Sequence, residues 1–430
     1  MNLTPLEPWI DHKIDHRDLE AYQLQKLNET LRLVKNNSRF YRRNSIDLPG
    51  DLGHLSELSR LPFTTAADLR ADPLAFVCVS QDAIQRVVTL NDANFPLTTL
   101  TTSGTTGQPK RLYFTRDDQA LTIDFFHIGM STFTAPGDRV LILLPGETPG
   151  SVGDLLATGL QRLGAIPSQH GPVRDAAATL EVMRREHIDV LVGVPTHVLA
   201  LARSAPKSTL KLKSVLLSTD HVPNAIKRAI ETAFDCTVYN HYGMTEMGLG
   251  GGVDCEARHG YHLREADLLF EIIEPASGER VPDGEYGEVV FTTLTRRGMP
   301  LIRYRTGDVS RFLTEACPCG TRLKTLERIT QRLDGRVTIG HHSLTLADLD
   351  EALFALDGVL NFTASLTRNE HGDNLQLALK TVNSHRVDAA VRHALSALPA
   401  LNGVALDLTC VDNIPSSMAK RTLLDRRQFA

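Results

Sequence analysis

Short apolar runs alternate with amphipathic segments through the middle of the chain, from about residue 87 to residue 234. Val140–Leu144, Val190–Val194 and Ser214–Leu217 are mainly apolar stretches, typical of strands buried on both faces of a sheet. Helical periodicity predicts helices before, between and after them, over Asp117–Phe133, Val152–Leu163, Ala176–Glu186 and Pro223–Phe234. This alternation predicts a mostly parallel α/β sheet with helices on both faces.

The pattern differs on either side of this region. Leu19–Leu33 has the apolar spacing of a helix, and Thr64 is placed to cap a second, short one. After residue 260, Leu268–Ile273, Glu288–Thr293 and Leu301–Tyr304 are predicted strands separated by Gly, Pro and Asp turns. Residues of about 260–333 are therefore expected to form a small antiparallel β-rich part.

The chain beyond residue 333 is predicted to form a separate small α+β unit. Thr345 and Asp348 have the spacing of a capping box at the start of a helix. Two strands, a second helix and a further strand are expected after it. The prediction is therefore a large N-terminal domain over residues 1–333, followed by a mobile C-terminal lid over residues 334–430.

Composition narrows the class of protein. The 430 residues include 46 Lys and Arg against 51 Asp and Glu, and 42% are hydrophobic. This is too apolar for a disordered chain and lacks the basic excess of a nucleic-acid-binding protein. No apolar run approaches the ~18 residues of a membrane span, and the N-terminus lacks a signal peptide. We expect a soluble cytoplasmic protein without nucleic-acid or membrane partners.

One glycine-rich and hydroxyl-rich segment indicates anion binding. Thr102, Ser103, Gly104, Thr105, Thr106 and Gly107 follow a predicted strand over Leu97–Leu100 and precede Lys110. Glycines let backbone N–H groups converge on an anion, and hydroxyls and a lysine add donors and charge. The segment is not a Walker A motif, because Pro109 and Arg111 occupy positions where that motif needs Gly and Ser or Thr. A surface loop without a ligand has a similar composition, so both interpretations stay open for this segment alone.

Together with later motifs in the same order, this segment resembles the adenylate-forming enzymes, which include acyl-CoA synthetases, luciferases and the adenylation domains of peptide synthetases. The other motifs are Tyr242–Glu246, Tyr304–Asp308, Arg332 with Asp334, and Lys420. The compact length, the entry Leu61–Thr65 and the insertion Cys317–Gly320 are most similar to the phenylacetate-CoA ligase branch. The resemblance covers nearly the whole chain.

The resemblance implies a role for each motif residue. Residues 102–107 and Lys110 would bind the β- and γ-phosphates of ATP, Thr245 the α-phosphate, and Glu246 a Mg²⁺ ion. Asp308 would accept both ribose hydroxyls. The other implied ATP-site residues are Asn240 and Tyr242 at the adenine, Arg332 at the ribose or phosphates, and Gly243. Taken alone, Tyr242 is compatible with ordinary packing, Asp308 with a turn, and Arg332 with a solvated charge.

Lys420 would act in the adenylation step. By the resemblance it would bridge the incoming carboxylate and the α-phosphate when the lid closes, with Asp334 as the hinge. On base rates, a single lysine near a C-terminus is a solvated surface residue. Its position after Ile414 and Pro415 favours the catalytic role.

The implied activity is that of an ATP-dependent carboxylate-CoA ligase acting through an acyl adenylate. ATP and CoA would be its co-substrates and Mg²⁺ its cofactor. An aromatic, phenylacetate-like or other compact acid is expected in a pocket formed by Pro195 and His197 at one strand end and Ser218 and His221 at the next. His341 stands where the branch has Gly, although Gly340 precedes it.

That departure leaves alternatives for the acyl acceptor, namely an acyl-carrier protein or an amine. A non-catalytic nucleotide sensor is a second alternative. The sequence leaves the oligomeric state open, with a homodimer as one option.

Four residues have side chains suited to a structural zinc ion: Cys255, His262, Cys317 and Cys319. His259 is a competing fourth ligand. Two unrelated pairs of buried thiols would give the same pattern. Metal sites of this kind occur in the phenylacetate-CoA ligase branch that the chain resembles, and this favours the zinc interpretation.

Overall fold

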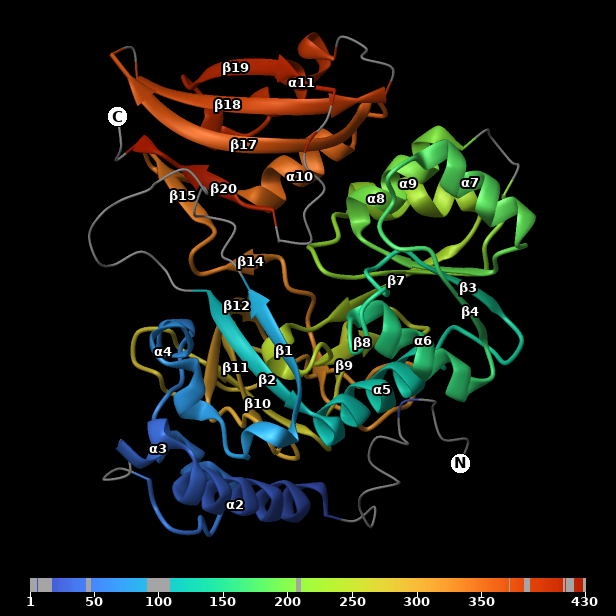
Figure 1. The fold of residues 1–430 in the computed structure, drawn as a ribbon. Coiled ribbons are helices and arrows are strands. Elements are labelled where there is room, and N and C mark those ends of the chain that lie inside the picture. Colours follow the sequence, from blue (N-terminus) through green and yellow to red (C-terminus); the bar gives the residue numbers. More distant parts are fainter. Residues whose placement is uncertain are drawn as a thin grey trace.

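A central sheet organises the N-terminal two thirds of the chain. The computed structural model describes residues 6, 18–43, 48–90, 109–205, 210–370, 372–382, 387–412, 414 and 421–427. The sheet has eight strands in the order β13-β9-β8-β7-β6-β5-β3-β4 (Figure 1). Its parallel strands are β3 (Arg139–Ile142), β4 (Ile166–Gln169), β5 (Val190–Gly193), β6 (Ser214–Leu217) and β7 (Thr237–Tyr242). Its antiparallel extension is formed by β8 (Gly252–Asp254), β9 (Tyr261–Leu263) and β13 (Thr325–Leu326).

Helices cover both faces of the parallel strands. Alternate residues of β3 pack on opposite layers: Val140 and Ile142 belong to the cluster with α5 and α6, and Leu141 to the cluster with α7, α8 and α9. The helices are α5 (Arg116–Met130), α6 (Val152–Leu163), α7 (Ala176–Arg185), α8 (Pro195–Ser204) and α9 (Asn224–Phe234). This two-sided burial explains the apolar runs, and the predicted parallel α/β architecture is confirmed.

Smaller antiparallel sheets and the N-terminal helices complete this part. One sheet has the order β10-β11-β12-β14, and β1 pairs with β2. The bounds are β1 (Ile84–Leu90), β2 (Lys110–Thr115), β10 (Leu268–Ile273), β11 (Gly287–Thr293), β12 (Tyr304–Ser310), β14 (Gln331–Arg332), α2 (Leu19–Asn37), α3 (Arg39–Arg43) and α4 (Ala66–Ala71). The small antiparallel sheet expected after residue 260 is therefore present.

Two local predictions in this part are wrong. The strand expected over Leu301–Tyr304 begins only at Tyr304 and continues to Ser310. The cap of α4 is Thr65, which forms a capping box with Asp68. The Thr64 hydroxyl instead donates to the carbonyl of Ile302 at 2.7 Å, inside the core.

Residues 334–430, named the C-terminal lobe below, carry a sheet of order β19-β18-β17-β20 beside α8 and α9 (Figure 1). The elements are β15 (Arg336–Ile339), β16 (His342–Thr345), α10 (Leu346–Phe354), β17 (Val359–Asn369), β18 (Gly372–Thr381), α11 (Asp388–Ser396), β19 (Ala405–Cys410) and β20 (Leu423–Asp425). The predicted capping box of α10 is confirmed. The lobe and helices α8 and α9 share one hydrophobic cluster, in which Phe354 and Phe362 belong to the lobe.

Within the described part of the chain, every helix is too short or too polar to cross a membrane.

Candidate active site

The carboxylate of Glu246 is buried in a short helical turn, η4 (Thr245–Met247), just after β7. The Lys110 ammonium, at the start of β2, lies 2.7 Å from Oε1 of Glu246, and the Tyr304 hydroxyl donates to the same oxygen at 3.1 Å. Burial alone would raise the pKa of Glu246, but Lys110 and these hydrogen bonds outweigh burial and lower it. Glu246 is therefore an ionised carboxylate inside the protein, paired with one cation.

The backbone around Glu246 has little freedom. A β carbon at Gly243 would lie 2.2 Å from the carbonyl oxygen of Leu249, so only glycine fits there. Gly248 ends η4 with a φ of 73°, in the left-handed region. The buried Arg296 donates to the carbonyl of Glu246 at 2.8 Å. These contacts fix the backbone positions of Thr245 and Glu246, the first two residues of η4.

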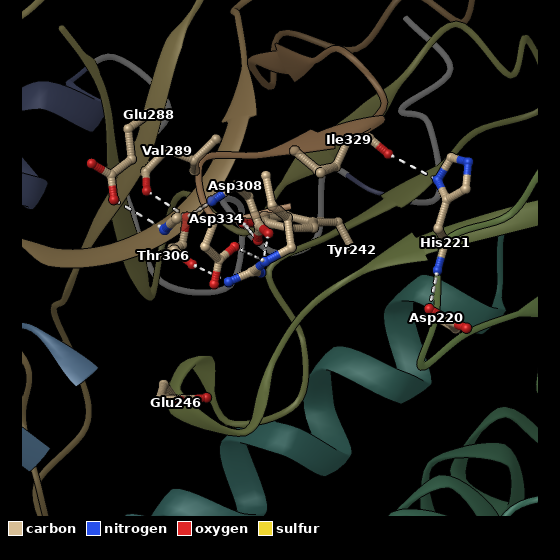
Figure 2. A network of polar contacts seen from close by, with 12 residues as sticks. Asp220, His221, Tyr242, Glu246, Glu288, Val289, Thr306, Asp308, Ile329 and Asp334 are labelled. Carbon is tan, nitrogen blue, oxygen red and sulfur yellow. Dashed lines mark hydrogen bonds and ion pairs between the residues drawn. The ribbon is translucent and has the colours of Figure 1, made fainter. Parts of the chain in front are cut away.

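A second carboxylate, Asp308, lies in the middle of β12 and is 1% exposed. The Tyr242 hydroxyl donates to Oδ2 of Asp308 at 3.0 Å (Figure 2). Arg332 on β14 pairs with Oδ1 of Asp308. Arg332 also donates to Asp334 at 3.2 Å. Burial and the charge of Asp308 raise the pKa of Tyr242 well above its usual value, so Tyr242 keeps its proton as a donor.

The backbone of β12 orients Asp308. Thr306 donates its hydroxyl to the carbonyl of Val289 at 2.7 Å and accepts the N–H of Asp308 at 3.0 Å. The N–H of Gly307 donates to Glu288 at 3.0 Å. Gly307 has a φ of 73°, which favours glycine at this position.

Asn240 lies on β7, two residues before Tyr242. Its N–H donates to Asp254 at 2.9 Å, and its side chain is buried. The side-chain oxygen of Asn240 has no hydrogen-bond partner among the described residues. A buried acceptor of this kind is costly unless a donor reaches it. The Tyr242 ring stacks on Tyr261, with ring centroids 5.7 Å apart.

Two of the residues predicted to form the acid pocket lie in a different element than expected. Strand β5 ends at Gly193, so Pro195 and His197 are not strand-end residues; they lie in the first turn of α8, where proline is well suited. The N–H of Ser218 donates to the carbonyl of Gly193 at 3.1 Å, which keeps the two segments adjacent. The Ser218 hydroxyl is hydrogen-bonded to Nδ1 of His241 at 2.9 Å.

The two histidines of the predicted pocket, His197 and His221, are half-buried in different surroundings. Nδ1 of His221 lies 3.3 Å from the carbonyl of Ile329 (Figure 2). Burial lowers the pKa of His221 and of His197, and for His197 the charge of Lys380 on the lobe adds to the effect. The structure thus brings Ser218 and His221 onto one turn and places His197 near the lobe.

The four predicted zinc ligands gather at the edge of the eight-stranded sheet. Sγ of Cys255 lies 3.4 Å from Sγ of Cys317, and Sγ of Cys319 lies 3.4 Å from Nε2 of His262. All four ligand atoms are within 4.8 Å of one another. His259 is exposed and is not part of this cluster. The donor set and its burial fit a closed tetrahedral zinc site.

Several predicted residues lie outside the described part of the chain. They are Thr102, Ser103, Gly104, Thr105, Thr106, Gly107 and Lys420, together with the strand predicted over Leu97–Leu100. Two contributors were not singled out from the sequence, Arg296 and His241. Arg296 acts through a backbone carbonyl, and His241 through a partner 23 residues away.

A family model described as AMP-binding enzyme matches residues 47–294, more than half of the chain. The chain belongs to this family. Its AMP-binding region contains Lys110, Tyr242 and Glu246, whereas Asp308 and Arg332 follow it.

Curated relatives and solved structures extend the match beyond the family model. A phenylacetate-coenzyme A ligase of Thermus thermophilus is 29% identical, with 82% of this AMP-binding chain and 79% of the relative covered. A phenylacetate-coenzyme A ligase of Escherichia coli is 27% identical, with 97% and 96% covered. The resemblance to the phenylacetate-CoA ligase branch is confirmed.

Among solved structures, 2-hydroxyisobutyryl-CoA ligase with 2-HIB-AMP in the postadenylation state has a TM-score of 0.79 at 23% identity, over 97% of this chain and 91% of that one. The same enzyme with CoA in the thioesterification state has a TM-score of 0.67 over the same shares. At this identity the match concerns the fold, and it agrees with the observed architecture.

Proposed function

We propose that this chain is an AMP-forming carboxylate-CoA ligase that joins a carboxylic acid to ATP as an acyl adenylate and then transfers the acyl group to CoA. Pyrophosphate leaves in the first step and AMP in the second. The observation that carries the assignment is the pair of buried carboxylates, Glu246 held by Lys110 and Asp308 held by Tyr242 and Arg332. ATP needs both, since one end carries phosphates and the other a ribose diol.

Asp308 is proposed to bind the ribose. Tyr242 and Arg332 each occupy one of its carboxylate oxygens, yet each oxygen has a further lone pair for a ribose hydroxyl. The unpartnered side-chain oxygen of Asn240, two residues along β7 from Tyr242, would accept the amino group of adenine. Tyr242 would lie against the purine face, braced by Tyr261 from behind.

Glu246 is proposed as the protein ligand of Mg²⁺. An ionised carboxylate on a fixed backbone suits a hard cation that keeps waters and phosphate oxygens as its other ligands. Bound Mg²⁺ would supply positive charge to the phosphate oxygens. Lys110, which pairs with Glu246, would then be free to donate to a phosphate. Thr245, next to Glu246 on the fixed turn, would donate to the α-phosphate.

The remaining assignments rest on residues outside the described part of the chain. Residues 102–107 would wrap the β- and γ-phosphates, and Lys420 would neutralise the two anions that meet at the α-phosphorus. Residues 1–333 and 334–430 would turn relative to each other about Asp334 between the two steps.

The acid is proposed to be aromatic or otherwise compact, supported by the curated relatives named for phenylacetate. Its pocket would lie between Ser218, His221 and the start of α8. Gly340, with a φ of 57°, forms the tip of the β15–β16 turn. A two-residue hairpin turn favours glycine at the position with positive φ, and Gly340 occupies it. The next position, 341, can therefore hold a histidine. We therefore propose CoA as the acceptor, and we propose a cytoplasmic location.

A pyrophosphate-exchange screen over aromatic, aliphatic and amino acids tests this function. We expect acid-dependent exchange with at least one aromatic or compact acid, and a loss of about a hundredfold in Lys420→Ala. Lys211→Ala is the matched control, because Lys211 is an exposed lysine that pairs with the exposed Asp235. Exchange with no acid would refute the enzymatic assignment, whereas exchange that survives Lys420→Ala would refute the role of the lysine.

The acceptor is tested separately. The purified protein, loaded with the acid selected by the screen, is offered CoA, an acyl-carrier protein or a simple amine. Thioester formation with CoA is the expected product. Preferential transfer to the carrier or the amine would move the chain to the corresponding alternative. Sedimentation of the same preparation decides between a monomer and the homodimer.

We further propose that Cys255, His262, Cys317 and Cys319 bind a structural zinc ion that joins β8 and β9 to the loop at 317–319. Protein purified without chelator should contain about one zinc per chain. Cys317→Ser should lose the metal and lower the melting temperature, whereas Cys236→Ser, outside the cluster, should keep it. Zinc-free wild-type protein with reduced thiols would contradict the site.

A further inference from the structure

Arg421, the residue after Lys420, lies in a mostly buried cluster with two carboxylates. Its Nε lies 2.9 Å from Oδ2 of Asp220, and its two terminal nitrogens lie 2.7 and 2.9 Å from the two oxygens of Asp350. The side chains of Arg421, Asp220 and Asp350 are 15%, 10% and 0% exposed. Because all three charges are largely removed from water, their geometry is strongly determined.

Most of this site belongs to the C-terminal lobe. Asp350 lies on α10, and the guanidinium of Arg421 also lies over the rings of Phe354 and Phe362, at 5.0 and 5.4 Å from their centroids. These contacts move with Arg421 whenever the lobe moves. The contact to Asp220 is different, because Asp220 follows β6 in the other part of the molecule.

Asp220 lies on the turn that carries two residues of the proposed acid pocket, Ser218 and His221. Thr219, just before it, has a φ of 79°, which is rare for a β-branched residue. The other oxygen of Asp220 accepts the N–H of His221 at 2.9 Å (Figure 2). The turn is therefore held in one shape, with one oxygen of Asp220 directed to the lobe.

A second contact joins the same two parts close by. Glu351, adjacent to Asp350 on α10, accepts the N–H groups of Asn224 and Ala225 at 2.6 and 3.1 Å. These groups lie at the start of α9, whose N-cap, Pro223, provides no side-chain cap. One turn of α10 thus supplies both the partner that fixes Arg421 in the lobe and the acceptor that caps α9.

We propose that Arg421 is a positioning residue, and that its ion pair with Asp220 sets the lobe orientation used in the adenylation step. The proposal rests on the proposed function. The pair joins the lobe to the acid-pocket turn, so it favours the lobe orientation in which these two parts are in contact. The Arg421–Asp220 pair must break before the lobe turns for acyl transfer, whereas the pair with Asp350 persists.

Asp220→Asn tests the pair without leaving a buried charge unpaired, because Arg421 keeps both oxygens of Asp350. With the acid selected by the exchange screen, we expect pyrophosphate exchange to fall by about tenfold. Transfer to CoA from supplied acyl adenylate should be unchanged or faster. Asp220→Glu, which keeps the charge, should recover most of the exchange.

Arg427→Ala is the matched control. Arg427 is also a lobe arginine with two carboxylate partners, but Asp373 and Asp425 both belong to the lobe. We expect its two half-reactions to stay in the wild-type ratio. An Asp220→Asn variant whose half-reactions keep that ratio, as in Arg427→Ala, would overturn the proposal.

Hydrogen exchange provides a readout that needs no substrate. If the Arg421–Asp220 pair holds the lobe, Asp220→Asn should speed exchange of the amides of Asn224 and Ala225, because Glu351 leaves with the lobe. Amide hydrogen exchange at the wild-type rate would overturn the proposal even if the protein proves inactive with every acid. Failure of the proposed function is recognised separately, by the absence of acid-dependent pyrophosphate exchange in the wild type.

Discussion

The two carboxylates of the candidate site are buried to a similar degree but have different partners. Glu246 is paired with a lysine, a mobile point charge, and Asp308 with an arginine and a tyrosine that fix both of its oxygens. A flexible partner suits a group that must accept a cation, and a rigid pair suits a group that must recognise a diol. These partners are consistent with the separate roles proposed for the two residues.

Tyr242→Phe isolates the hydrogen bond to Asp308. The variant keeps the ring on Tyr261 and removes one donor, which is worth about 1 kcal/mol. We expect the KM for ATP to rise about fivefold with little change in kcat. Tyr239→Phe, on the same strand but stacked on Phe133, is the control and should leave the KM unchanged. Equal KM values in the two variants would contradict the role of the hydroxyl.

Glu246→Gln should change how stability depends on pH. The folded-state pKa of Glu246 is below its ordinary value of 4.5, so the unfolded chain binds more protons and the carboxylate stabilises the fold above that value. We expect the free energy of unfolding of the wild type to exceed that of the variant by about 1 to 3 kcal/mol at pH 7. The difference should shrink as the pH falls below 4.5. Urea unfolding at several pH values measures it, and a difference independent of pH would contradict the assignment.

At the scale of elements, the sequence predicted regular structure well where one physical rule acts alone. Helix α6 and strands β6 and β10 have the predicted bounds, because burial on a known face fixes their patterns. Strand β7 was not predicted, since the polar residues Asn240 and His241 interrupt its apolar run. Helix α8 was read as a strand end because proline at a first helical turn has the same sequence context as a proline that ends a strand.

The candidate site was predictable in part for the same reason. Tyr242, Glu246, Asp308 and Arg332 stand in recognisable motifs, whereas Arg296 and Arg421 act through partners far apart in the sequence. Nothing local marks such partners. For the proposed metal site, the sequence favoured His262 over His259, and the cluster contains His262. The sheet register that places His262 opposite Thr325 could not be predicted from the sequence.

The capping box of α10 offers a test at this scale. Thr345→Ala removes the hydroxyl that accepts the N–H of Asp348 at 3.2 Å and should cost about 1 kcal/mol. Ser151→Ala is the matched control, because Ser151 occupies the N-cap of α6 without a side-chain hydrogen bond to the helix. Chemical denaturation of both variants measures the effect. An equal loss in the two would show that the box contributes nothing.

At the scale of the whole molecule, a buried arginine ties the N-terminal segment to the antiparallel sheet. Arg303 is 2% exposed, pairs with Glu271 at 3.1 Å, and donates to the carbonyls of Ser59 and Leu61 at 3.0 Å each. Its guanidinium lies 4.0 Å from the ring centroid of Phe63. A single side chain therefore joins segments more than 200 residues apart.

Arg303→Met should be severely destabilising, by about 3 to 5 kcal/mol, because it leaves Glu271 charged, buried and unpaired. Adding Glu271→Gln should recover part of the loss. Denaturation of the two single variants and the double variant measures the coupling. Additive losses would mean that the two charges do not depend on each other.

The hydrophobic cluster shared by the lobe and helices α8 and α9 affects how the protein is handled. A polypeptide shortened to residues 1–333 would lose Phe354, Phe362 and their neighbours and bare the apolar surface that they cover. Uncovered surface of this kind promotes self-association. Truncation, a common aid to crystal growth for two-part enzymes, is therefore a poor choice here, and a nucleotide that selects one arrangement of the intact chain is the better route.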